Sequence, residues 1–368
     1  MRIAQVAPPF ESVPPRGYGG TERVIHTLTE ELARRGHEVT LFASADSHTS
    51  ARLVPTVGEA VWHHRPPYRE LALFMSVVLG KVLRELDRFD IIHGHLEWWG
   101  FPLERASHTK VVSTLHGRLD LPELQIAFRE YVDAPVVSIS NAQRAPVHWA
   151  NFVGTVYHGI DLTEFTFNKG PGRYLAFLGR ASPEKGLDTA IRVARRAGMR
   201  LKVATRMPQP FRNDPYVRAD WEHWEQAVLP LLGPDVDLVG EVGGHDKDEF
   251  LGNASALVFP IRWPEPFGLV MIEALACGTP VVALRAGSVP EVIRDGVTGF
   301  ICESEDALVA AVGRICEIDR ARCREEAERR FSGGAMADRY ERVYERLTRP
   351  GPTIFDLGGG SKPTLSKP

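Results

Sequence analysis

The chain has 368 residues, a formal net charge of -3, 43% hydrophobic residues and 25% charged residues. This length exceeds one typical hydrophobic core and predicts a folded protein with two domains of ordinary size. Lysine and arginine form no block that stands out against the acidic residues, so we expect no nucleic-acid partner. A phosphate-binding site would therefore have to be local.

Cysteine usage and apolar patterning favour a cytoplasmic protein. The four cysteines all lie in the C-terminal half and form no C-x-x-C pair, which predicts reduced packing thiols rather than a disulfide or zinc site: Cys277, Cys302, Cys316 and Cys323. The first residues begin a strand and show no signal-peptide pattern. The longest apolar stretch outside strands, residues 71–83, is interrupted by Gly80 and Lys81 and is too short to span a bilayer.

The first elements follow a strand, loop, helix and strand order. Residues 3–7 predict a strand, and residues 8–20 form a loop rich in proline and glycine. A helix follows, with apolar residues at helical spacing, and then a strand over 39–43. The second half repeats this order with a strand over 174–178, a loop over 179–186, a helix over 187–197 and a strand over 201–204. Two doubly wound α/β units are therefore expected.

Further strands are predicted at 91–93, 111–115, 136–139, 236–239, 256–259 and 280–283, alternating with helices such as 71–86. This alternation predicts parallel sheets with ligands at the carboxyl ends of the strands. Residues 159–172 are the best candidate for a linker. We expect an N-terminal domain over 1–165, a second domain over 166–333, a helix within 334–350 that crosses back to the N-terminal domain, and a flexible tail over 351–368.

The segment EPFGLVMIEALACGTPVVA contains two glutamates that indicate a ligand site. Glu273 lies in an apolar run, where an unpartnered carboxylate would cost several kcal/mol, so we expect something polar to be bound there. Pro264, Pro266 and Gly268 place Glu265 in a loop and Glu273 on the following helix. Along that helix axis the two carboxylates would be roughly 12 Å apart, about the length of a sugar, a diphosphate and a ribose.

Two loops that precede helices carry groups suited to phosphate. Arg180 and Lys185 lie in GRASPEKG beside a predicted helix start, where two cations suit a diphosphate. Taken alone, two such residues are more often solvated surface. A second junction, formed by Phe267, Gly268, Leu269 and Val270, could supply backbone amides to the same phosphates.

The N-terminal loop RGYGGTE, with Arg16, Gly17, Gly19 and Gly20, lets backbone approach an anionic ligand closely. It does not match G-x-G-x-x-G, which disfavours a nicotinamide cofactor. A loop without a ligand is the alternative.

Histidines end two of the predicted strands. His116 follows the strand over 111–115 and should stand at the carboxyl edge of the sheet, either in a functional or in a structural role. His93 and His95 share one strand face, but no third ligand accompanies them, so a metal site is disfavoured.

The motifs GGTE, STLHG, HGID, GRASPEKG and EPFGLVMIEALACGTPVVALRAGSVPEVIRDGVTGF resemble the retaining glycosyltransferases of family 4, which have the two-domain GT-B fold with Rossmann-like halves facing a central cleft. The resemblance extends to about Tyr344. It implies that Glu273 binds the ribose and that Glu265, with amides near Phe267 and Gly268, binds hydroxyls of the donor sugar. It also implies that Arg180 and Lys185 neutralise the diphosphate with help from Gly19 and Gly20, that His116 orients the transferred sugar, and that backbone near Glu241 lines the base pocket.

The resemblance further implies retention by front-face attack, with no metal and no cofactor. The donor would be a nucleoside diphosphate hexose, with uridine diphosphate glucose favoured over guanosine diphosphate mannose by family frequency alone. The acceptor could be a sugar, a lipid-linked sugar or a small molecule. Its candidate ligands are the polar residues of the N-terminal half: Glu11, Arg16, His63, His64, Glu97, Arg118 and Asp120.

Two other functions stay open on the sequence: a sugar-nucleotide epimerase on the same fold, and a non-catalytic nucleotide-sugar-binding protein. Peripheral membrane contact also stays open, since relatives often act on lipid-linked acceptors. The basic set Arg192, Arg195, Arg196 and Arg200 could contribute to it, but a solvated helix face is favoured.

Overall fold

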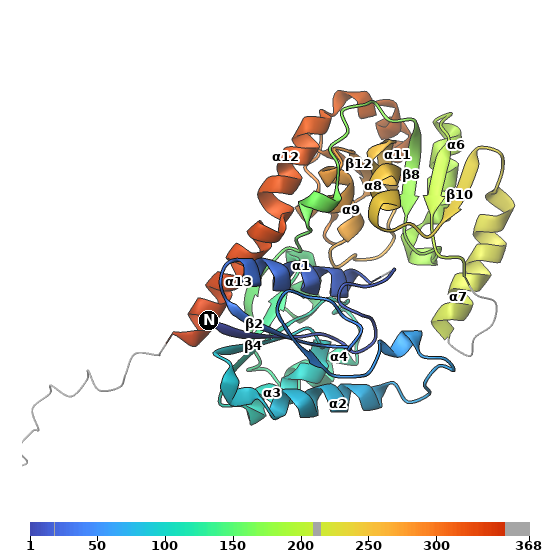
Figure 1. The fold of residues 1–368 in the computed structure, drawn as a ribbon. Coiled ribbons are helices and arrows are strands. Elements are labelled where there is room, and N and C mark those ends of the chain that lie inside the picture. Colours follow the sequence, from blue (N-terminus) through green and yellow to red (C-terminus); the bar gives the residue numbers. More distant parts are fainter. Residues whose placement is uncertain (18, 209–214, 350–368) are drawn as a thin grey trace, which may run out of the picture.

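The computed structural model describes all residues except 18, 209–214 and 350–368 (Figure 1). The predicted flexible tail, residues 351–368, lies outside the described residues. No helix in the described part of the chain combines the length and apolarity needed to cross a bilayer.

The first half is built on a seven-stranded sheet in the order β3-β2-β1-β4-β5-β6-β7. Its strands are β1 (Arg2–Val6), β2 (Glu38–Ala43), β3 (Arg52–Pro55), β4 (Ile91–Gly94), β5 (Lys110–Thr114), β6 (Val136–Ser138) and β7 (Phe152–Thr155). Its helices are α1 (Gly20–Arg34), α2 (Ala72–Leu83), α3 (Phe101–Ala106), α4 (Leu124–Glu130) and α5 (Asn141–Arg144). All pairings in this sheet are parallel.

The second half has a six-stranded sheet in the order β10-β9-β8-β11-β12-β13, also parallel throughout. Its strands are β8 (Tyr174–Leu178), β9 (Leu201–Ala204), β10 (Val236–Gly240), β11 (Ala254–Phe259), β12 (Val281–Leu284) and β13 (Gly299–Cys302). Its helices are α6 (Leu187–Arg196), α7 (Pro215–His223), α8 (Gly244–Gly252), α9 (Leu269–Ala276), α10 (Val289–Val292), α11 (Glu305–Gly313) and α12 (Arg320–Phe331). Both sheets therefore have the doubly wound topology expected from the sequence.

Three strands were not predicted: β3, β7 and β13. Each has only four residues, and β3 and β7 show no continuous buried run, so their patterns are weak. The helix predicted over 71–86 ends at Leu83, and a separate 3-10 turn spans Leu86–Arg88.

The last described helix, α13 (Gly333–Thr348), returns to the first half of the chain. Figure 1 shows it beside α1, below α12. Its buried Met336, Tyr340 and Tyr344 pack in one hydrophobic cluster with Ile3 and Leu28. The guanidinium of Arg35 on α1's C-terminal side pairs with Glu341 at 2.6 Å. The C-terminal helix is thus part of the N-terminal core.

The packing of α13 generates a stability prediction. Ala337 is fully buried on this helix, so Ala337→Asp should place a carboxylate in an apolar site and lower the free energy of unfolding by about 3 kcal/mol or more. Arg346→Asp introduces the same side chain at an exposed position of α13 and should cost less than about 1 kcal/mol. Urea denaturation measures both values. Equal losses would show that α13 is not a core element.

Candidate functional site

The strand order of each sheet reverses at one place, between β1 and β4 in the first and between β8 and β11 in the second. Doubly wound sheets bind ligands outside the carboxyl ends of the strands at such switch points. The loops after β1, β4, β8 and β11 contain Gly19, Glu97, Arg180, Lys185 and Glu265, and His116 follows the neighbouring strand β5.

Glu265 and Lys185 form an ion pair that joins the loop after β8 to the loop after β11. The Nζ of Lys185 lies 2.6 Å from Oε2 of Glu265, and both side chains are largely buried. The indole Nε1 of Trp263 donates to the same oxygen at 2.8 Å. The ammonium also lies 5.3 Å from the centroid of the Trp263 ring. Two of the predicted site residues are therefore in direct contact.

The turn after β12 holds the loop that contains Glu265. Gly287 has a φ of 50°, and a Cβ there would lie 2.3 Å from the backbone oxygen of Glu265, so this approach requires glycine. Ser288 donates from its amide to that oxygen at 3.0 Å and from Oγ to the backbone oxygen of Phe267 at 2.8 Å. Helix α9 begins two residues after Phe267, and its first N–H groups lack acceptors within the helix.

Glu273 is buried on α9, as expected, and its carboxylate has a partner within the chain, so its burial alone does not require a bound polar group. Its Oε1 lies 2.5 Å from Nζ of Lys247 on α8, and each of the two residues is at least nine-tenths buried. Since a buried carboxylate needs a partner, this lysine already supplies one within the chain. Among the described residues, Lys247 donates to Oε1 of this carboxylate and not to Oε2.

Arg180 does not share a carboxylate with Lys185. Its guanidinium pairs with Glu184 at 2.7 Å and with Asp220 at 3.6 Å, and its side chain is half exposed. The positive charges of GRASPEKG are therefore locally balanced by acidic neighbours.

The N-terminal glycine loop lies against the second half at two points. A Cβ on Gly20 would come within 3.1 Å of Leu269 at the start of α9, and one on Gly17 would lie 3.9 Å from Oε2 of Glu241. Arg16 turns to Asp46 instead, at 3.1 Å. The loop thus approaches both the α9 start and Glu241, which the resemblance associates with the donor.

His116 is connected to the second half through stacked rings. Its ring lies 5.1 Å from that of His158, which in turn contacts Phe267 edge-on at 4.9 Å. Its Nε2 is 2.8 Å from Nδ1 of His95. Burial lowers the pKa of His116 to about 3, so the ring is neutral at physiological pH. All four ring nitrogens of His93 and His95 are hydrogen-bonded to neighbouring side chains.

The acceptor candidates fall into separate groups. Oε1 of Glu97 accepts from the amides of His116 and Gly117 at 2.7 and 3.0 Å, and burial raises the pKa of this carboxyl to about 7. Glu97 also adopts a left-handed φ of 52°, a strained conformation for a residue other than glycine. Arg118 pairs with Asp120 at 2.6 Å.

The remaining candidates lie in the loops after β1 and β3. Buried Glu11 pairs with His63 at 2.7 Å, and His64 stacks on Tyr68. The structure therefore brings Glu97 to His116 and Arg118 to Asp120, and it pairs Glu11 with His63.

Four contributors were not singled out from the sequence: Trp263, Lys247, His158 and Glu291. The carboxylate of Glu291 accepts from the amides of Asn141 and Ala142, at 2.8 and 2.7 Å, and ties the two halves together. His158 and Glu291 stand in HGID and GSVPEV, two of the motifs that carried the resemblance. No sequence pattern distinguished Lys247.

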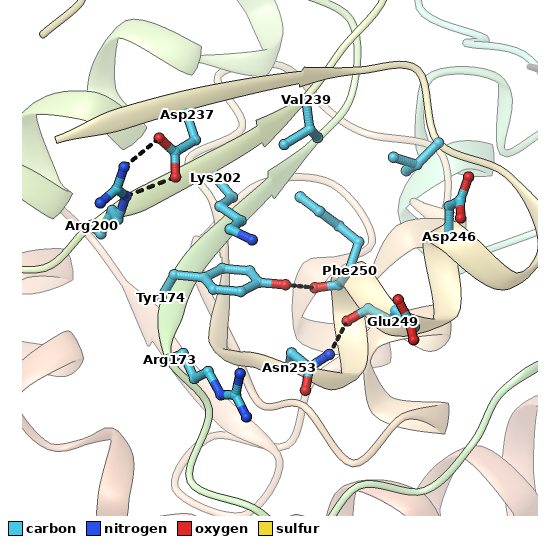
Figure 2. Close-up of a pocket in the computed structure, with 11 residues that line it drawn as sticks. Arg173, Tyr174, Arg200, Lys202, Asp237, Val239, Asp246, Glu249, Phe250 and Asn253 are labelled. Atoms are coloured by element: carbon cyan, nitrogen blue, oxygen red, sulfur yellow. Dashed lines mark hydrogen bonds and ion pairs between the residues drawn. The ribbon is translucent and has the colours of Figure 1, made fainter. Parts of the chain in front are cut away.

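A cavity of about 510 Å³ lies elsewhere, beside the first residues of β8 and β9 (Figure 2). Arg200 forms a two-armed pair with Asp237 there, and the hydroxyl of Tyr174 donates to the backbone oxygen of Phe250. This cavity is at the amino ends of these strands, whereas the predicted site is at the carboxyl ends.

The basic set considered for membrane contact is neutralised by acidic partners. Arg192, Arg195, Arg196 and Arg200 each pair with an aspartate or glutamate within 3.1 Å. These ion pairs favour the alternative of a solvated surface.

Comparison with known proteins bears on the family of this chain. The family model "Glycosyltransferase Family 4" matches residues 18–164, and the model "Glycosyl transferases group 1" matches residues 223–330. D-inositol 3-phosphate glycosyltransferase of Mycobacterium tuberculosis (strain ATCC 25618 / H37Rv) is 28% identical over 407 residues, covering 90% of this chain and 82% of the relative.

Two solved structures share the fold. AviGT4, a glycosyltransferase involved in avilamycin A biosynthesis, has a TM-score of 0.71 and 23% identity, over 95% of this chain and 98% of that one. Sucrose-phosphate synthase from Thermosynechococcus elongatus has a TM-score of 0.74 and 21% identity, over 94% and 98%. Together with the family matches, the two facing Rossmann-like halves define a glycosyltransferase of the GT-B fold. The chain belongs to glycosyltransferase family 4.

The pair of Lys247 and Glu273 yields a test that needs no ligand. Lys247→Met should leave a buried carboxylate unpaired and lower the free energy of unfolding by about 3–5 kcal/mol. The double variant Lys247→Met with Glu273→Leu replaces both charges by apolar groups and should recover most of that loss. Denaturant titration of the single and double variants completes the cycle. A double variant as unstable as the sum of the two single variants would contradict the pairing.

Proposed function

We propose that this glycosyltransferase moves a hexose from a nucleoside diphosphate sugar, with uridine diphosphate glucose favoured, to an acceptor hydroxyl with retention of configuration. The observation that carries the proposal is the contact of Lys185 with Glu265 beside the start of α9. It combines a cation, a carboxylate and helix N–H groups at a switch point.

The ion pairs leave capacity for a phosphate. Lysine has three N–H donors and arginine has five. Within the described residues the ammonium of Lys185 donates a hydrogen bond to Glu265 alone, and its remaining N–H groups can turn to a diphosphate oxygen. The bonds to Glu265 from Lys185 and Trp263 end on Oε2, so that Oε1 can accept from a sugar hydroxyl. Glu273 likewise accepts from a lysine, Lys247, at one oxygen, Oε1, and we assign its other oxygen, Oε2, to the ribose hydroxyls.

The reaction follows from these roles. The bond between C1 of the hexose and the β-phosphate oxygen breaks, and the leaving diphosphate gains charge next to Arg180, Lys185 and the α9 amides. The acceptor oxygen bonds to C1 on the same face, and its proton passes to the departing phosphate oxygen. The products are the glycoside and the nucleoside diphosphate. His116 is neutral and orients the sugar rather than carrying charge.

Known structures support the choice of donor. HepE of Anabaena, with a TM-score of 0.70 and 18% identity over 94% of this chain and all of that one, was solved with UDP and glucose. We infer the same nucleotide class for this chain. The acceptor is assigned no further than a hydroxyl compound, although the mycobacterial relative is named for an inositol phosphate.

Calorimetry tests the donor. UDP should bind to the purified protein with micromolar affinity, and GDP should bind at least about tenfold more weakly, a difference of about 1.4 kcal/mol. Tighter binding of GDP would overturn the choice of base. Absence of binding by either nucleotide would overturn the donor site itself.

A second test separates turnover from folding. Arg180→Ala removes a cation that should stabilise the leaving diphosphate, and it should lower kcat for transfer or hydrolysis of UDP-glucose about 100-fold. Arg195→Ala is the matched control, because Arg195 is equally exposed and also forms an ion pair, but it lies on α6 next to Asp235. Its kcat should stay near that of the wild type. Equal kinetics of both variants would remove Arg180 from the site.

A further inference from the structure

The ring of His116 is the end of a chain of buried hydrogen bonds that begins on α13. Its Nε2 is 2.8 Å from Nδ1 of His95, and Nε2 of His95 is 2.8 Å from Oε1 of Gln5. The amide Nε2 of Gln5 donates to the hydroxyl of Tyr344 at 3.1 Å. The same hydroxyl is 2.7 Å from Nδ1 of His93, which leads through Thr114 to Tyr340.

The members of this chain are withdrawn from water. Gln5, His93, Tyr340 and Tyr344 are fully buried, and His95 is 1% exposed. Buried polar groups depend on their protein partners, because losing one leaves the other unsatisfied. Burial also lowers the pKa values of the histidines, which keeps the rings neutral. A neutral imidazole has one donor and one acceptor nitrogen, so each bond fixes the role of the next.

The Gln5 amide sets the direction of the chain. Because its nitrogen donates to Tyr344, its oxygen accepts from Nε2–H of His95. Nδ1 of His95 then carries no proton and accepts from Nε2–H of His116. The remaining nitrogen of His116, Nδ1, is an acceptor, and within the described residues this buried atom has no hydrogen-bond partner.

We propose that Gln5, His95 and Tyr344 are positioning residues that act through His116: they hold it in the Nε2–H tautomer, so that Nδ1 offers a lone pair to a hydroxyl of the bound sugar. The proposal rests on the proposed function, in which His116 lies beside the transferred hexose. It adds that the C-terminal helix, through Tyr344, takes part in orienting the donor sugar.

The tautomer is measurable without any substrate. In protein labelled with ¹⁵N-histidine, long-range ¹H–¹⁵N spectra should show a protonated Nε2 and an unprotonated Nδ1 for His116, with the signals assigned by their loss in His116→Gln. In Gln5→Met the acceptor for His95 is removed, and the His116 signals should move toward those of a tautomer mixture. A wild-type Nδ1–H tautomer, or unchanged signals in Gln5→Met, would overturn the proposal.

Kinetics of two tyrosine variants supply the second readout. Tyr344→Phe removes the hydroxyl that orients Gln5 and should lower kcat for UDP-glucose turnover roughly 3- to 10-fold, the effect of one hydrogen bond, with UDP affinity unchanged. Tyr340→Phe removes an equally buried hydroxyl from the same helix but leaves every link from Tyr344 to His116 intact, and its kcat should stay close to that of the wild type.

The outcomes distinguish this proposal from the proposed function. Equal losses of kcat in both tyrosine variants, or loss of UDP affinity in Tyr344→Phe, would indicate a merely structural role and overturn the positioning role. Wild-type protein that binds neither UDP nor GDP would overturn the donor site, while the spectra would still report the direction of the chain.

Discussion

Parallel strand pairing is the constraint on which the site depends. Because every strand in each sheet runs the same way, every loop that follows a strand emerges at one edge. The reversal of strand order between β8 and β11 then brings loops from residues 179–186 and 260–268 together, although some 80 residues separate Lys185 from Glu265. The same reversal between β1 and β4 directs the glycine loop toward the second half. The strand order of the two sheets therefore brings the residues of the candidate site together.

The cationic side chains at the site are paired with carboxylates. Lys185 pairs with Glu265, Arg180 with Glu184 and Lys247 with Glu273. Lys185 and Lys247 are largely buried, and an isolated buried cation would be costly in the free protein, so their carboxylate partners offset that cost. A diphosphate would enter as an additional acceptor for donors that the carboxylates do not use. Under the proposed function, the phosphates would thus be recognised locally in a protein whose net charge is slightly negative.

The sequence predicted the doubly wound topology and the loops at the switch points, because apolar strands alternating with amphipathic helices leave a strong periodic signal. It placed Glu265 in a loop and Glu273 on a buried helix face. It could not identify Lys247 as the partner of Glu273, since that contact joins two helices whose relative placement no local pattern encodes. The short strands β3, β7 and β13 were missed for a related reason, because four residues carry little periodicity.

The two places where the chain crosses between the halves are bonded to each other, and this determines how closure can act on the site. The amide of Ile160 donates to the backbone oxygen of Phe331, and that of Gly333 donates to Ile160, each at 2.9 Å. Helix α13 starts at this junction, and its buried face packs in the hydrophobic cluster of the first half. A rotation about the junction would therefore carry α13, Gln5, His95 and His116 as one body, while Lys185, Glu265 and α9 stay with the second half. Closure would bring an already oriented imidazole to the sugar without breaking the hydrogen bonds that orient it.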